Sequence, residues 1–108
     1  MGVTDRQRLR TPPKPVAKAA LKGLRLRNRF RRGGTASGLA RAKALGGRAA
    51  MDAASFQRLA GYFARHRFET RARSFGDETN PSASYIAWLL HGGDEGAAWV
   101  ARERDTLD

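Results

Sequence analysis

Basic side chains in the first half of the sequence have a spacing suited to binding phosphate groups. Between residues 18 and 32, lysine and arginine recur every three or four positions, so a helix would carry them on one face. Arginine outnumbers lysine by 17 to 4 in the chain, and its planar guanidinium group pairs with phosphate through two hydrogen bonds. We therefore expect a nucleic-acid-binding surface made of Lys18, Lys22, Arg25, Arg29, Arg31, Arg32, Arg41, Lys43 and Arg48.

The sequence holds no motif that reads bases. It has no zinc-finger pattern and no recognisable recognition helix, and Phe30 alone is a poor platform for stacking bases. Arg32-Gly33-Gly34 matches one copy of an RGG box, but a glycine pair at this place is more typical of a helix end. We therefore expect binding to the phosphate backbone without base specificity. If six to ten cations contact phosphates, affinity should fall by about 10³–10⁵ between about 50 and 200 mM salt.

Catalytic and metal-binding chemistry lacks the residues it needs. Cysteine is absent, which excludes disulfides and thiolate chemistry, and two histidines cannot form a multi-histidine metal cluster. His66 and His91 are predicted at the C-terminal ends of helices, where a partial positive charge suits the helix dipole. The acidic pairs 77–78 and 94–95 are adjacent in sequence, so each pair cannot share a helix face. We expect a protein that is not an enzyme, with no catalytic residues, no cofactor and no metal.

Positive charge is concentrated at one end of the chain. The net charge of the 108 residues is +11, divided into +13 for residues 1–48, +3 for 49–73 and −5 for 74–108. This polarity indicates one half that faces a polyanion and another that faces solvent or a partner, although a basic run can also be a solvated surface. No run of about 20 apolar residues could span a membrane, and the N-terminus lacks the apolar segment of a secretory signal.

The length fits one small domain preceded by an arm. Residues 1–15 are predicted to form an extended, proline-rich basic arm, because prolines 12, 13 and 15 do not continue a helix. Apart from Val3 and Leu9, the arm has no large apolar side chain with which to dock. Residues 16–102 are predicted to form a small helical domain, and residues 103–108 a charged tail.

Three helices are predicted in the first two thirds of the chain. The first covers about residues 16–32 and ends at the glycine pair 33–34. The second follows a cap at Thr35 or Ser37 and ends near the glycine pair 46–47. The third follows a cap at Asp52 or Ser55, and its apolar residues recur with the clearest helical period in the sequence. Its expected core-facing residues are Phe56, Leu59, Ala60, Phe63 and Ala64.

Two further helices complete the prediction. Asn80 is expected to cap a helix whose first residue is Pro81 and which ends near the glycine pair 92–93. Its expected buried residues are Ala83, Ile86, Ala87 and Leu90, and a last short helix, capped by Asp94, should bury Trp99 and Val100. No segment alternates apolar and polar residues as a strand would. The predicted fold is therefore all-α, with four to five short helices separated by Gly-Gly breaks.

Most aromatic residues lie in the C-terminal two thirds of the chain. Of these, Phe56, Phe63, Trp88 and Trp99 are expected in the core, because a small domain this rich in alanine needs large side chains there. Tyr62 and Tyr85 are expected to be surface contacts.

Three segments resemble a small domain found in proteins of tailed bacteriophages. They are RGGTASGLARA at residues 32–42, YFARH at 62–66 and PSASYIAWLLHGGD at 81–94. In that family the domain occurs alone or attached to virion-associated proteins, and the resemblance covers about residues 16–102. It implies a phage protein associated with the capsid or the packaged genome, and it supplies no catalytic residue.

Two functions are compatible with the sequence. The first is non-enzymatic, sequence-independent binding of nucleic acid, with DNA as the first choice. The alternative is a virion structural or accessory protein whose basic arm becomes ordered on an acidic protein surface. Either protein would act in the host cytoplasm or in the virion, without a membrane partner and without being secreted. The sequence leaves the oligomeric state open.

Overall fold

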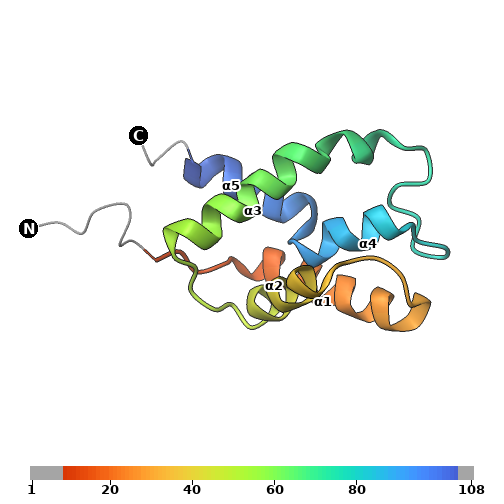
Figure 1. Ribbon diagram of the computed structural model, residues 1–108, viewed down its shortest axis with the longest axis horizontal. Helices are drawn as coiled ribbons and strands as arrows, with labels where there is room; N and C mark the ends of the chain where they lie inside the picture. The colour runs from red at the N-terminus through yellow and green to blue at the C-terminus, as the bar shows by residue number, and fades with distance from the viewer. Residues whose placement is uncertain (1–8, 105–108) are drawn as a thin grey trace, which may run out of the picture.

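The computed structural model describes residues 9–104 and consists of short helices (Figure 1). These are α1 (Lys14–Phe30), α2 (Ala36–Gly46), α3 (Ala53–His66), the 3₁₀ helix η1 (Arg67–Arg71), α4 (Ala83–Leu90) and α5 (Gly93–Arg104). No strand occurs within these residues, so the predicted all-α class is confirmed. None of the helices in this range is both long and apolar enough to cross a membrane.

The helices are arranged in layers, with α4 and α5 between the outer helices (Figure 1). Figure 1 shows α3 along one long side and α1 with α2 along the other, while α4 and α5 lie between. α1 packs against α2, α4 and α5, and α3 packs against α5. α1 therefore contacts α4 and α5, which are far from it in sequence.

α1 approaches α4 more closely than any side chain on the contact would allow. A Cβ atom on Gly23 would lie 2.8 Å from the backbone nitrogen of Leu90 and 3.0 Å from the carbonyl carbon of Leu89. Because these neighbours are backbone atoms, they cannot move aside as a flexible side chain would. The close approach explains why a glycine, a poor helix former, lies in the middle of α1.

Aromatic residues of α3, α4 and α5 build the centre of the core. The rings of Phe56 and Trp99 make an edge-to-face contact with centroids 5.4 Å apart, and those of Phe63 and Trp88 do so at 4.9 Å. This geometry matches the quadrupoles of aromatic rings. The predicted stripe of α3 is confirmed at Phe56, Leu59 and Phe63, which are all buried. Of the remaining predicted members, Ala60 is half-buried and Ala64 is exposed.

α1 begins and ends earlier than predicted. It starts at Lys14 and includes Pro15 in its first turn, where a missing backbone N–H has no consequence. It ends at Phe30, because Arg31 adopts the left-handed conformation (φ 56°) and its N–H bonds to the carbonyl of Arg27 at 2.8 Å. The glycine pair that follows also has positive φ, 86° and 82°, so it turns the loop after the helix has already ended.

α4 also begins later than predicted. Ser82, not Asn80, is its N-cap, and the Ser82 hydroxyl accepts the N–H of Tyr85 at 3.0 Å. Asn80 lies in a turn organised by Asp77, whose carboxylate accepts the N–H of Thr79 and of Asn80. Asn80 and Ser82 have similar preferences for the N-cap position, and the tertiary fold selects Ser82. As a result Ala83, expected to be buried, is exposed.

Two other caps follow the prediction, whereas Asp94 does not cap the last helix, because α5 begins at Gly93 and Asp94 lies in its first turn. Thr35 caps α2 and accepts the N–H of Gly38 at 3.1 Å, and Asp52 caps α3 and accepts the N–H of Ser55 at 2.8 Å. The last helix is longer than expected, since α5 extends to Arg104 and takes in the first two residues assigned to the tail. Residues 105–108 of the predicted tail lie outside the described range.

The described part of the N-terminal arm docks on the core, contrary to expectation. Arg10 exchanges two backbone hydrogen bonds with Met51, of 2.9 and 2.8 Å, and only 4% of Arg10 is exposed. Its guanidinium group lies over the ring of Phe56, 4.8 Å from the centroid. Pro12 is buried as well. The prediction failed because it counted only aliphatic side chains as anchors, whereas a guanidinium group can bury its stem and stack on an aromatic face. Residues 1–8 lie outside the described range.

Candidate nucleic-acid interface

Four basic residues form a cationic stripe on the outer face of α1. These residues are Lys18, Lys22, Arg25 and Arg29, on the side of the helix opposite the buried Val16, Ala20 and Gly23. From Lys18 to Arg29 the stripe extends about 17 Å along the helix axis. The apolar period of α1 thus fixes which way these cations point: burying one face of the helix directs the other to solvent.

Most of the stripe has no internal partner. Lys22 forms an ion pair with Glu78 at 2.6 Å, and Glu78 also accepts the hydroxyl of Tyr85 at 3.1 Å. The hydrogen bond from Lys22, followed by that from Tyr85, lowers the pKa of the Glu78 carboxyl group below its usual range. In contrast, Lys18, Arg25 and Arg29 make no hydrogen bond or ion pair with residues 9–104. Their charges are available to an external anion.

The end of α1 adds two arginines to the stripe. Arg31 and Arg32 are both exposed, and Arg29 and Arg32 lie over the ring of Phe30, 5.1 and 5.8 Å from its centroid. Arg32 also donates to the Asn80 side chain at 3.3 Å and to the carbonyl of Pro81 at 3.1 Å. Phe30 therefore contacts two guanidinium groups, and Arg32 has a structural contact in addition to its exposed charge.

Acidic residues lie beside part of the stripe. Asp94 and Glu95, in the first turn of α5, line the same open groove as Lys18, Lys22 and Arg25. A Cβ atom on Gly93 would lie 3.1 Å from Ala19, so this acidic turn packs beside the N-terminal half of α1. The acidic side chains oppose phosphate binding in this groove, which Arg29, Arg31 and Arg32 do not line. We call these three residues, together with Arg25, the arginine cluster.

The remaining predicted site residues lie elsewhere. Lys43 is exposed on α2. The Arg48 side chain donates to the carbonyl of Pro12 at 2.8 Å and so secures the docked arm. Arg41 is half-buried, donates to the carbonyl of Ser55 at 3.4 Å and lines a different pocket, between α2 and α3. The structure thus gives Arg41 and Arg48 internal roles that the one-dimensional charge pattern does not reveal.

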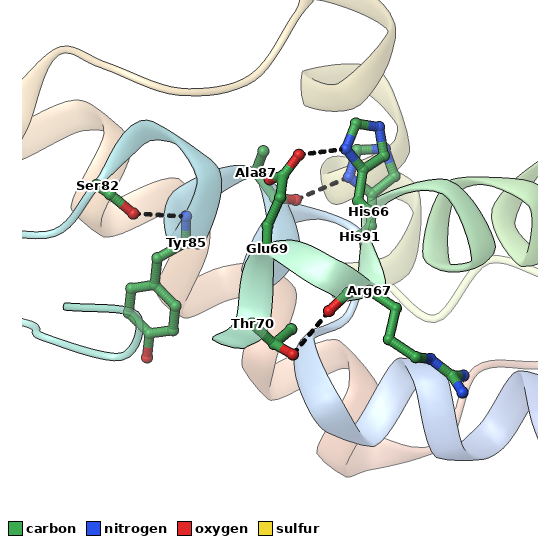
Figure 2. A network of polar contacts seen from close by, with 8 residues as sticks. All are labelled: His66, Arg67, Glu69, Thr70, Ser82, Tyr85, Ala87 and His91. Carbon is green, nitrogen blue, oxygen red and sulfur yellow. Dashed lines mark hydrogen bonds and ion pairs between the residues drawn. The ribbon is translucent and has the colours of Figure 1, made fainter. Parts of the chain in front are cut away.

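The two histidines meet at a tyrosine that was expected on the surface. Tyr62 is 8% exposed, and its ring stacks on those of His66 and His91, with centroids 4.5 and 3.5 Å apart. Figure 2 shows Nδ1 of His66 bonded to the Glu69 carboxylate and Nδ1 of His91 bonded to the carbonyl of Ala87, both at 2.8 Å. Both histidines lie at helix ends, as predicted. The meeting of their rings at Tyr62 was not predicted from the sequence.

Tyr85 is likewise buried, with 9% exposed, because it packs edge-to-face against Phe75 while its hydroxyl reaches Glu78. The expectation that both tyrosines lie on the surface is therefore wrong. In each case the phenolic ring fills the interior, and the hydroxyl of Tyr85 keeps a polar partner there.

No known protein family, curated protein or solved structure matches this chain.

Burial around His91 disfavours its charged form. Desolvation lowers the pKa of His91 to about 4, and the charges of Arg41, His66 and Arg65 act in the same direction, whereas the bond to the Ala87 carbonyl opposes them. The imidazole is therefore neutral at pH 7, with its proton on Nδ1 to donate to Ala87 and its Nε2 lone pair unprotonated.

This shift predicts an acid destabilisation that begins near neutral pH. Between about pH 6.5 and 4, His91 takes up a proton in the unfolded chain but not in the folded one, so the free energy of unfolding falls as pH falls. The slope should approach about 1.4 kcal/mol per pH unit, and urea denaturation between about pH 6.5 and 5 measures it.

The interval is chosen to limit the contribution of carboxyl groups. The pKa values of Asp52, Glu69, Asp77 and Glu78 lie below their usual range in the folded protein, so these four groups add to the slope mainly below about pH 5, where the unfolded chain binds protons and the folded chain does not. His91→Gln, whose amide can still donate to Ala87, should reduce the slope. An equal slope in the wild type and in His91→Gln would assign the proton uptake to another group.

Proposed function

We propose that this protein binds nucleic acid through the phosphate backbone, without reading the base sequence. The observation that carries the proposal is the arginine cluster. Arg25, Arg29 and Arg31 are exposed on one side of the molecule, and their side chains make no hydrogen bond or ion pair within the described chain. The charge of Glu78 acts on Arg25 without forming an ion pair. Exposed cations that repel one another are a cost to the folded protein, and a bound polyanion would reduce this cost.

The chemistry of the cluster favours phosphate over bases. Guanidinium groups pair with phosphate in a bidentate manner, and their binding releases counterions from the nucleic acid. Phe30, the aromatic residue of the cluster, already packs against the guanidinium groups of Arg29 and Arg32. Its ring is also half-buried, so it offers little surface for stacking on a base. Contacts of this kind position a protein on a strand but carry no sequence information.

A phage origin is a proposal of its own and rests on the bacteriophage-like segments of the sequence. In a particle, such a protein would contact the packaged genome, with DNA as the expected polyanion. The alternative, a virion accessory protein that places its basic arm on an acidic protein surface, is less well supported. Arg10, one of the three arginines of the arm, is buried over Phe56, so this cation is not presented to a partner.

Fluorescence anisotropy with two labelled duplexes of unrelated sequence tests the proposal. At about 100 mM salt we expect dissociation constants in the range of about 10⁻⁶ to 10⁻⁴ M, equal for the two duplexes within a few-fold. Polyglutamate of similar charge serves as the acidic-protein control and should bind more weakly. Binding to polyglutamate but to neither duplex would reject nucleic acid in favour of the accessory-protein alternative.

A further inference from the structure

A second pocket, separate from the arginine cluster, lies between α2, α3 and α4. Its volume is about 640 Å³, within the range of about 300–1,000 Å³ typical of small-molecule sites. Several ionisable or aromatic side chains that line it are not part of the proposed nucleic-acid interface. They are Arg41, Arg58, Tyr62, Arg65, His66 and His91.

The charge of this pocket is positive and uncompensated. Three arginines line it against one carboxylate, Glu69, which is engaged by the imidazole of His66 at 2.8 Å. Burial lowers the pKa of the Arg41 guanidinium group, and the charge of Arg58 lowers it further. Arg41 has a carbonyl partner at 3.4 Å but no carboxylate among residues 9–104. A partly desolvated cation without an anion is a cost that a bound anion would offset.

Tyr62 provides an independent sign of an incomplete site. Its hydroxyl oxygen is buried and has no hydrogen-bond partner in the described part of the chain, although the ring lines the pocket. Leaving such a group unsatisfied costs about 1–3 kcal/mol. The carboxylate of Glu69 is close enough for its charge to act on this hydroxyl, raising the pKa of Tyr62 after the larger effect of burial. Tyr62 therefore gives the pocket wall a residue with an unsatisfied polar group.

The beginning of α2 adds donors and a favourable dipole. Gly34, Thr35 and Ser37 line the pocket at the N-terminus of this 11-residue helix. A Cβ atom on Gly38 would lie 3.4 Å from Cε1 of His91, so the imidazole packs against the first turn of α2. The N-terminus of a helix carries partial positive charge and favours anions. It therefore acts in the same direction as the three arginines.

We infer that this pocket binds a phosphate monoester, with Arg41 and Arg58 as the principal ligands of the phosphate oxygens. A cation is disfavoured by the three guanidinium groups. A phosphate within a strand carries one charge and continues into a sugar on both sides, whereas a monoester carries about two charges and ends in free oxygens that a concave site can surround. The same chemistry occurs at the phosphorylated end of a strand and in a free mononucleotide.

Titration with inorganic phosphate at constant ionic strength, followed by NMR of the histidine Cε1–H signals, tests the inference. We expect saturable shifts of the signals of His66 and His91 near pH 7. Arg58→Gln should weaken binding by about tenfold or more, the value of one charge-assisted hydrogen bond. Arg58 is exposed, and within residues 9–104 its side chain forms a hydrogen bond only to the hydroxyl of Ser55, so this variant is expected to fold. Absence of saturable shifts in the folded wild type would overturn the inference.

Arg67→Gln is the matched control for Arg58→Gln. Arg67 is also exposed and near His66 in sequence, but it points away from the imidazoles and does not line the pocket (Figure 2). It should bind phosphate like the wild type. If Arg58→Gln and Arg67→Gln weakened binding equally, the effect would be one of overall charge, and the assigned pocket would be wrong.

Competition experiments separate the two sources of the monoester. An oligonucleotide with a 5′-phosphate should displace inorganic phosphate if the ligand is a strand end, and a mononucleotide alone should do so if the ligand is a small molecule. A 5′-hydroxyl oligonucleotide that displaced phosphate equally well would contradict the choice of a monoester. The inference does not depend on the arginine cluster, because replacing Arg25, Arg29 and Arg31 should leave binding of inorganic phosphate intact.

Discussion

Replacing Trp88 with alanine is expected to lower the free energy of unfolding by about 3–5 kcal/mol, the usual cost of removing a buried tryptophan. The side chain is 4% exposed and packs edge-to-face against Phe63 and Phe75. Its indole nitrogen also donates to the carboxylate of Asp94 at 2.9 Å, which ties α4 to the start of α5. Urea denaturation followed by far-UV circular dichroism measures the change.

Phe68→Ala is the control for Trp88→Ala. Phe68 is also aromatic but lies in η1 with 65% of its surface exposed, so its removal should change stability by no more than about 0.5 kcal/mol. A loss below about 1 kcal/mol for Trp88→Ala would show that the indole does not support the core, and the packing described for α4 would have to be revised.

The triple change Arg25→Glu, Arg29→Glu and Arg31→Glu should weaken binding to duplex DNA by about 10²–10³-fold. Each phosphate contact contributes a slope of about −0.9 to the dependence of log affinity on log salt, which amounts to about eightfold per contact near 0.1 M salt. Arg32 is left out of this set because it holds the carbonyl of Pro81, and replacing Arg32 would mix structural with electrostatic effects.

A second triple variant controls for net charge. Arg67, Arg71 and Arg102 are exposed residues outside the arginine cluster, in η1 and α5, and replacing them with glutamate changes the net charge equally. We expect this variant to retain affinity within about tenfold of the wild type, since screening at about 0.15 M salt limits charge effects to about 8 Å. Equal losses in the two variants would mean that binding depends on total charge and has no defined surface.

Features that depend on neighbours in sequence could be predicted. The period of Phe56, Leu59 and Phe63 specified both the helix and its buried face, and the caps at Thr35 and Asp52 follow from side-chain preferences that act over three residues. The five α-helices were predicted for the same reason. Their ends were less certain, because Ser82 and Asn80 have similar capping preferences and only the tertiary packing selects between them.

Features that depend on distant segments could not be predicted. Arg10 pairs with Met51 across 41 positions of the sequence, and the rings of His66 and His91 meet at Tyr62 from two different helices. One wall of the pocket between α2, α3 and α4 is visible in the sequence, because residues 58, 62, 65 and 66 are polar and a helix places them on one face. The other walls come from α2 and α4, so the pocket itself could not be predicted from this pattern.

The salt dependence of DNA binding tests the central claim most directly. Fluorescence anisotropy measures the association constant between the protein and a DNA duplex of arbitrary sequence at salt concentrations between about 50 and 300 mM. The measurement is made for the wild type and for the triple variant with glutamate at positions 25, 29 and 31. If these three side chains contact phosphates, the slope of log affinity against log salt should be less steep in the variant by about 2.7. Equal slopes and equal affinities for the two proteins would contradict the assignment of the arginine cluster as the nucleic-acid interface.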